Sequence, residues 1–103
     1  MEKEIILKMK KDSNAGLGRI FRSLRRVKSL ENVSDYILYK RIIITLSEAG
    51  YDLSNQSIVR HFSNVSTEEY SLAEKGLILK DLRKTVSLYK PSNGELKEDK
   101  NRI

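Results

Sequence analysis

The 103-residue sequence has no cysteine, no tryptophan, one proline and one histidine. Without cysteine there is no disulfide, thiol nucleophile or thiolate metal ligand. One histidine also excludes a site built from two imidazoles. Because the only proline is Pro91, nothing earlier in the chain interrupts a helix in the way proline does. We therefore expect a mainly helical protein with no metal or cofactor.

Long apolar runs are also absent. Residues 42–44 form one of the longest runs, far short of the roughly 20 residues that cross a bilayer. Residues 1–11 lack the apolar core of a secretion signal. The length suits a single domain. These features predict a soluble, cytoplasmic, one-domain protein.

Positive charge is plentiful and unevenly distributed. The net charge is +6, which is typical of proteins that bind nucleic acid, anionic membranes or acidic partners. Residues 1–30 carry nine basic and three acidic side chains, residues 31–75 carry four and seven, and residues 76–103 carry seven and four. Both ends are basic and the middle is acidic.

The first periodic segment is an amphipathic helix that begins near Asn14. We expect residues 1–13 to form a basic arm, although their pattern does not separate a short strand from a frayed segment. Asp12, Ser13 or Asn14 is expected to cap the helix. Apolar residues recur at helical spacing, and the opposite side carries arginines: Leu17, Ile20, Phe21, Leu24 and Val27 against Arg19, Arg22, Arg25 and Arg26.

Three more helices follow in the prediction. Ser34 and Gly50 are placed to cap and end a helix over 35–49. A short helix is expected from Ser54 to Phe62, and then a tight turn at 63–65. The string 66–69, Ser-Thr-Glu-Glu, fits a capping box that starts a helix over 66–75.

Residues 77–89 have two possible structures. If Gly76 ends the preceding helix, 77–80 and 85–89 form a β-hairpin that uses the β-branched residues. If the helix continues instead, Gly76 lies inside it at a cost of about 1 kcal/mol. We expect the hairpin. Residues 14–91 would then form the domain, and 92–103 a polar tail.

This order of elements resembles the winged helix-turn-helix proteins of the MarR and PadR kind. The most specific piece is residues 72–78, Leu-Ala-Glu-Lys-Gly-Leu-Ile, which is similar to the entry to the wing in that family. The resemblance implies an α+β fold, mainly α with a small hairpin, preceded here by the basic amphipathic helix. It also implies binding of double-stranded DNA.

The resemblance assigns roles to residues of this sequence. Helix 55–62 would position helix 67–75 in the major groove, where Tyr70 and Ser71 would face base edges. Phosphate contacts would come from three places. The start of helix 55–62 would supply Asn55, Gln56 and Ser57, with Arg60 further along the same helix. Helix 67–75 would supply Thr67 and Lys75, and the wing tip Arg83 and Lys84.

The arginine helix is a second candidate for DNA contact. No acidic residue lies between Asp12 and Glu31, and arginine matches phosphate geometry better than any other side chain. We expect the four arginines and Lys28 to supply salt-dependent affinity. The same pattern also fits the solvated side of an ordinary helix, and membrane-surface binding is a more distant alternative.

A homodimer is predicted from surplus apolar surface on helix 35–49. One helix of a small monomer needs fewer apolar side chains than this segment carries, and a dimer would present two recognition helices to DNA. The expected interface consists of Tyr36, Ile37, Tyr39 and Ile44.

No enzymatic site emerges from the sequence. His61 has no histidine partner, and the carboxylates of Glu68 and Glu69 point to different sides of a helix. We therefore predict a DNA-binding, nucleoid-associated transcriptional regulator, or a plasmid or virus partition or architectural factor. The alternative is a helical adaptor that links a DNA-bound complex to a protein partner through its acidic middle. RNA binding is a weaker third possibility.

Overall fold

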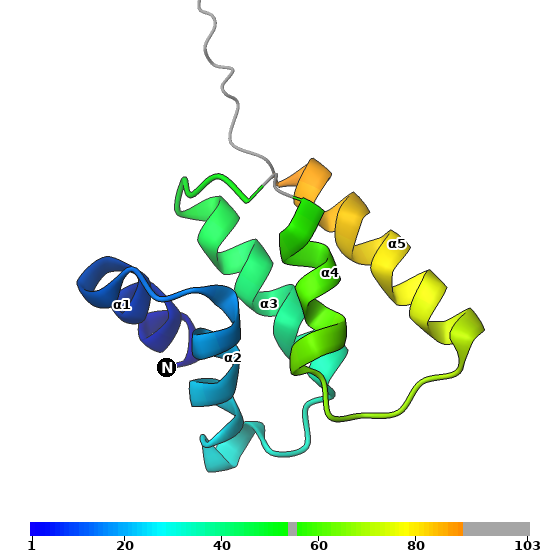
Figure 1. Ribbon diagram of the computed structural model, residues 1–103. Coiled ribbons are helices and arrows are strands. Elements are labelled where there is room, and N and C mark those ends of the chain that lie inside the picture. Colours follow the sequence, from blue (N-terminus) through cyan, green and yellow to red (C-terminus); the bar gives the residue numbers. More distant parts are fainter. Residues whose placement is uncertain (54–55, 90–103) are drawn as a thin grey trace, which may run out of the picture.

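The computed structural model describes residues 1–53 and 56–89. All regular structure in these two ranges is helical (Figure 1). The elements are α1 (Glu2–Ser13), α2 (Leu17–Arg25), the 3-10 turn η1 (Lys28–Leu30), α3 (Asp35–Glu48), α4 (Gln56–Val65) and α5 (Leu72–Leu88). The expected α+β fold with a wing is therefore wrong.

Helix α3 lies at the centre of the bundle and packs against α1, α2 and α5. Helix α4 lies between α2 and α5 and contacts both (Figure 1). An aromatic row joins the elements through edge-to-face contacts, from Phe21 through Tyr39 to Phe62. The Tyr39 hydroxyl donates to the backbone carbonyl of Ile58. Burial of these large rings is the main source of stability at this junction.

Helix α5 runs without interruption through the segment predicted to be a hairpin. Its start is fixed by a complete capping box between Ser71 and Glu74. Leu82, Thr85 and Val86 are buried, so the β-branched residues at 85 and 86 are held by packing on the helix. Gly76 lies on the exposed side, where its cost of about 1 kcal/mol is small beside the burial of this face.

The region predicted to be a helix-turn-helix has a different shape. Residues 63–65 complete α4 and do not form a turn. Residues 66–71 are not helical, so the recognition helix expected over 67–75 does not form. Helices α4 and α5 run in opposite directions across this connection (Figure 1), unlike the steep crossing of a DNA-binding helix pair.

The first thirteen residues belong to the helical bundle. Ile6 of α1 is fully buried, and Arg41 of α3 pairs with Glu2 at 3.2 Å. Asn14 does not cap α2 but ends α1 in the left-handed conformation, with φ of 48°. The segment predicted as an arm is therefore a packed helix.

The helix predicted over 35–49 is confirmed. The Ser34 hydroxyl accepts a hydrogen bond from the amide of Ile37. Gly50 has a φ of 98°, the conformation expected of a residue just beyond a helix end. Ser54 and residues 90–103, including the predicted tail, lie outside the described residues.

Candidate functional site

Helix α2 presents arginines to solvent along one side. Arg19, Arg22 and Arg26 are exposed, and none of them forms an ion pair or hydrogen bond with any residue that the structure describes. Lys28 of η1 is also exposed and unpaired within the described ranges. We call these four residues the arginine surface. It is a set of cations without acidic partners in the part of the chain that the structure describes.

Arg25 lies on the same helix but points inward. Its guanidinium donates to Oδ1 of Asp35 at 2.9 Å and to the carbonyl oxygens of Leu30 and Val33 at 2.7 and 2.8 Å. It also lies over the ring of Phe21. Arg25 was predicted to contact DNA together with its neighbours, but the structure gives it a structural role.

Asp35 is the acceptor at the centre of this polar network. It is 1% exposed and also accepts hydrogen bonds from residues of the 66–71 connection. The Ser66 hydroxyl lies 3.1 Å from its carboxylate, and the amide of Thr67 lies 2.8 Å away. Such satisfied networks fix one arrangement of the groups around them. Asp35 thus holds α2, η1 and the 66–71 connection at the start of α3.

Helices α2 and α4 are in close contact at Gly18. A Cβ atom there would lie 2.6 Å from Nε2 of His61 and 3.4 Å from a methyl carbon of Val65. The same Cβ would lie 3.4 Å from Nη1 of Arg22. Because position 18 has no side chain, the His61 imidazole packs directly against the backbone of α2.

The residues predicted to read DNA bases have other roles. Thr67 donates its amide and hydroxyl hydrogens to Asp35. Tyr70 packs against Phe62 and donates to Glu68, and burial together with that carboxylate raises the pKa of Tyr70 to about 12. Ser71 caps α5. These three residues maintain the fold, and none is available as a reading residue on a helix.

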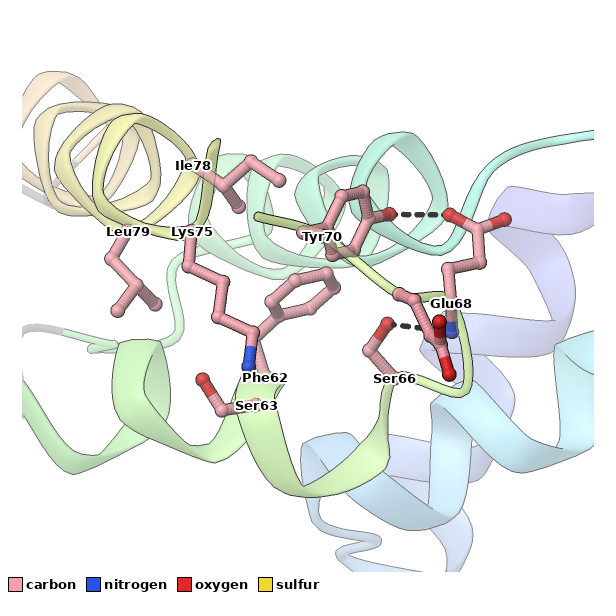
Figure 2. A pocket seen from close by; sticks show the side chains of 9 residues that line it. Phe62, Ser63, Ser66, Glu68, Tyr70, Lys75, Ile78 and Leu79 are labelled. Atoms are coloured by element: carbon pink, nitrogen blue, oxygen red, sulfur yellow. Dashed lines mark hydrogen bonds between the residues drawn. The ribbon is translucent and has the colours of Figure 1, made fainter. Parts of the chain in front are cut away.

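A hollow of about 380 Å³ lies between α4, the 66–71 connection and α5 (Figure 2). Its apolar walls are Phe62, Ile78 and Leu79, and the Lys75 side chain extends across it toward α4. Lys75 was predicted to lie near phosphates. In the structure it is exposed at this hollow.

The remaining predicted DNA contacts lie on α4 and α5. Arg60 is exposed on α4. Arg83 and Lys84 are exposed on α5, and not at the tip of a wing. Ser57 is exposed near the start of α4. Asn55 and the Gln56 side chain lie outside the described part of the chain, as does the phosphate site predicted there.

The four residues predicted to form a dimer interface differ in their burial. Tyr39 is fully buried and Ile44 is half-buried. Ile37 is 39% exposed. Tyr36 is half-buried and donates to Asp81 of α5. Tyr39 therefore belongs to the core, and of the four residues only Ile37 is an exposed apolar side chain.

Asp81 forms a second polar cluster, which links α5 to α3. It accepts from the Tyr36 hydroxyl and from Nζ of Lys40, the latter at 2.9 Å. The two hydrogen bonds, first that of Tyr36, lower the pKa of the Asp81 carboxyl below 3.8. The hydrogen bond to Asp81 raises the pKa of Lys40. Burial of the Tyr36 hydroxyl and, to a smaller extent, its hydrogen bond to Asp81 raise the pKa of Tyr36.

Sequence patterns gave little sign of these residues. Asp35 appears in the sequence as an ordinary acidic residue in the first turn of a helix, and its partner Arg25 appears as one of four equivalent arginines. Gly18 and His61 are 43 positions apart, and nothing local connects them. The only available signal is that Gly18 interrupts a helix otherwise made of residues with side chains.

Comparisons with protein-family models, curated proteins and solved structures find no significant match. No helix in ranges 1–53 and 56–89 has both the length and the apolar character needed to cross a membrane. Among these residues, no group of three or more side chains is arranged to hold a metal ion.

Proposed function

We propose that this protein binds nucleic acid, with duplex DNA as the preferred form, through the arginine surface. One observation carries the proposal: Arg19 and Arg22 of α2, and Arg26 directly after its last residue, are exposed and have no acidic partner among the described residues. Unpaired arginines gathered on one side of a helix favour binding of phosphate oxygens, which accept their hydrogen bonds in a planar, charge-assisted arrangement.

The spacing of these arginines suits a phosphate backbone. Arg19 and Arg26 are seven residues apart, which is about 10 Å along a helix axis. That distance equals about three base-pair steps of a DNA strand. Arg19, Arg22 and Arg26 follow one another on the same side of α2, so they would contact neighbouring phosphates.

Backbone contact of this kind binds DNA with little preference for sequence. A sequence-reading role was predicted for a helix over 67–75, but residues 67–71 are not helical and only 72–75 belong to a helix, the first turn of α5. The function that the residues support is therefore general duplex binding, as in an architectural or partition factor. The alternative role as a protein adaptor is favoured by exposed apolar side chains on α5, where Leu72, Leu77 and Leu88 are 88%, 68% and 70% exposed.

The test compares two triple variants with equal loss of charge. The first replaces the arginines of α2 (Arg19→Ala, Arg22→Ala and Arg26→Ala), and the control replaces cations of α5 (Lys80→Ala, Arg83→Ala and Lys84→Ala). Fluorescence anisotropy with a labelled 20-base-pair duplex measures affinity over a series of salt concentrations. Three or four neutralised phosphates give a slope of log K against log salt between about −2.7 and −3.6.

We expect the α2 triple variant to lose nearly all affinity and the control triple to lose little. If both variants weaken binding equally, net charge is responsible and the arginine surface is not. Absence of duplex binding by the wild-type chain at low salt contradicts the proposal as a whole. In that case, the exposed apolar side chains of α5 make the adaptor role the better candidate.

A further inference from the structure

Four residues of α5 form a line along one side of the helix. Leu77, Lys84 and Leu88 are exposed, and Asp81 is half-buried. The four are separated by four, three and four positions, the spacing that keeps side chains on one side of a helix and forms the contact between two paired helices. We call these four residues the α5 stripe. Along the chain it reads leucine, acid, base, leucine.

The two leucines of the α5 stripe make no contribution to the core. The side of α5 that packs in the bundle buries other residues, among them Leu82, and neither Leu77 nor Leu88 belongs to the core or to the side chains packed against it. Apolar side chains exposed together are typical of an interaction surface. Leu72 is exposed too, but it lies about 140° around the helix from Leu77 and is not part of the stripe.

The two charged residues of the stripe can each take a further partner. Tyr36 and Lys40 both donate to Oδ2 of Asp81, and Oδ1 accepts no hydrogen bond from a described residue. Lys84 forms no ion pair or hydrogen bond with any residue in ranges 1–53 and 56–89. Opposite charges therefore lie next to each other at the middle of the stripe, with a leucine four positions beyond each.

This order is complementary to itself when two copies of α5 run in opposite directions. Leu77 of each copy then meets Leu88 of the other at the ends of the stripe, and Asp81 of each meets Lys84 of the other at its centre. In a parallel pair every residue meets its own counterpart, so like charges face each other, which is destabilising. Charged residues inside a helix pair fix its register and direction while lowering its affinity. The pattern therefore favours a second copy, in one orientation.

We propose that a second copy of this chain docks antiparallel on the α5 stripe, across a two-fold axis that passes between Asp81 and Lys84. The contact is isologous, because the same surface serves both copies. It is centred on four residues from each copy, fewer than the roughly 20–30 residues a side of a standard interface. We therefore expect a weak dimer, with a Kd in the micromolar range. The dimer interface predicted on helix 35–49 is replaced by one on α5.

Docking through the α5 stripe leaves both arginine surfaces uncovered. Helices α3 and α4 separate α2 from α5 (Figure 1), and the arginines of the surface face solvent. The two arginine surfaces therefore lie on the far sides of the dimer, where each contacts its own duplex. Bridging of two duplex segments in this way rests on the proposed function and makes it more specific, since it favours an architectural role.

Sedimentation equilibrium of the full chain without DNA tests the dimer. We expect the wild-type protein to be monomeric at nanomolar and dimeric at millimolar concentration. The double variant Leu77→Ala, Leu88→Ala should weaken association roughly tenfold or more, and alanine preserves the helix because of its high helix propensity. Lys84→Glu should weaken association similarly, because it brings a carboxylate against Asp81 of the second copy.

Two control variants make the same chemical changes away from the stripe. Leu72→Ala removes another exposed leucine, and Arg83→Glu reverses a charge about 100° around the helix from Lys84. Neither should alter association, and circular dichroism shows whether each variant is folded. A wild-type protein that stays monomeric at millimolar concentration overturns the proposal. A dimer that the stripe variants leave intact overturns it as well.

Cross-linking tests the direction of pairing, because the sequence has no cysteine of its own. Leu77→Cys and Leu88→Cys are prepared separately and oxidised alone and as a mixture. In the antiparallel dimer, like positions lie about 16 Å apart along the helix axis, beyond the roughly 7 Å between Cα atoms that a disulfide spans. Disulfide-linked dimers should form in the mixture and not in either variant alone. Cross-linking of each variant with itself overturns the antiparallel arrangement.

Bridging is measured by capture of a fluorescent duplex on an immobilised duplex in the presence of the protein. The double variant Leu77→Ala, Leu88→Ala should bind a single duplex as the wild type does but should not capture the second one. Capture by the double variant overturns bridging through the α5 stripe. If the wild-type protein binds no duplex at low salt, the proposed function is wrong, and sedimentation without DNA still decides whether the dimer forms.

Discussion

The contrast between Arg25 and Arg22 gives a sharp test of the structure. Arg25→Ala removes hydrogen bonds to Asp35, Leu30 and Val33 and leaves the buried carboxylate of Asp35 without a cation. Breaking a buried ion pair by removing one partner typically costs about 3–5 kcal/mol. The Arg25 side chain is 25% exposed and Asp35 keeps other donors, so we expect the lower end of that range, about 3 kcal/mol.

Arg22→Ala is the matched variant, since it removes the same guanidinium three residues earlier in α2, where the side chain forms no ion pair or hydrogen bond with a described residue. A surface change of this kind usually alters stability by less than about 0.5 kcal/mol. Urea unfolding of both variants, followed by far-ultraviolet circular dichroism, measures the difference. For a domain of this size, Arg25→Ala should also lower the Tm by roughly 12–24 °C.

Arg25→Ala should be the less stable of the two variants, whereas Arg22→Ala should be the one with weaker DNA binding. Arg22→Ala should weaken duplex binding while the protein stays as stable as the wild type. Arg25→Ala, where it remains folded, should bind nearly as well as the wild type. Equal stability of the two variants would refute the structural role of Arg25. Equal loss of duplex binding by the two variants would refute the distinction between Arg25 and Arg22.

Two further predictions concern glycines and acid. Gly76→Ala should stabilise the protein by about 1 kcal/mol, since nothing lies within 4 Å of the new Cβ. Gly18→Ala should destabilise it by about 1–3 kcal/mol, because the new Cβ would overpack the contact with His61. Urea unfolding measures both changes, and a stabilising Gly18→Ala would contradict the close contact of α2 with α4. The pKa of Asp81 is lowered by hydrogen bonds from Tyr36 and Lys40, so its contribution to stability is complete above the ordinary pKa of 3.8 and is lost as the pH falls through the lowered value. Wild-type protein should therefore lose more stability than Asp81→Asn when the pH falls below 3.8, and equal acid sensitivity of the two in urea unfolding would count against the cluster.

The helices that end in clear local signals were predictable from sequence. Ser34 and Gly50 mark the limits of α3 because capping depends on residues close in the chain. The inner face of α2 was also predictable from its periodicity. Its neighbour Arg25 was not, because the acceptor that distinguishes it from Arg22 lies ten residues away, at Asp35.

The start of α5 shows why local signals mislead. Ser66 with Glu69, and Ser71 with Glu74, both match the capping-box pattern, and the sequence alone does not rank them. In the structure the Ser66 hydroxyl donates to Asp35, so a tertiary contact removes the first candidate. The second box then starts a helix long enough to bury Leu82, and that burial outweighs the preference of the following residues for a strand.

The Asp35 network also determines which parts of the protein unfold together in local fluctuations. The Asp35 carboxylate receives hydrogen bonds from α2 and from the 66–71 connection, while Arg25 also donates to the carbonyl of Leu30 in η1 and to that of Val33 after it. The η1 region and the 66–71 connection, more than thirty residues apart in sequence, therefore cannot lose these hydrogen bonds independently. A fluctuation that releases one of them exposes the amides of both to solvent, so the two connections behave in hydrogen exchange as a single cooperative unit.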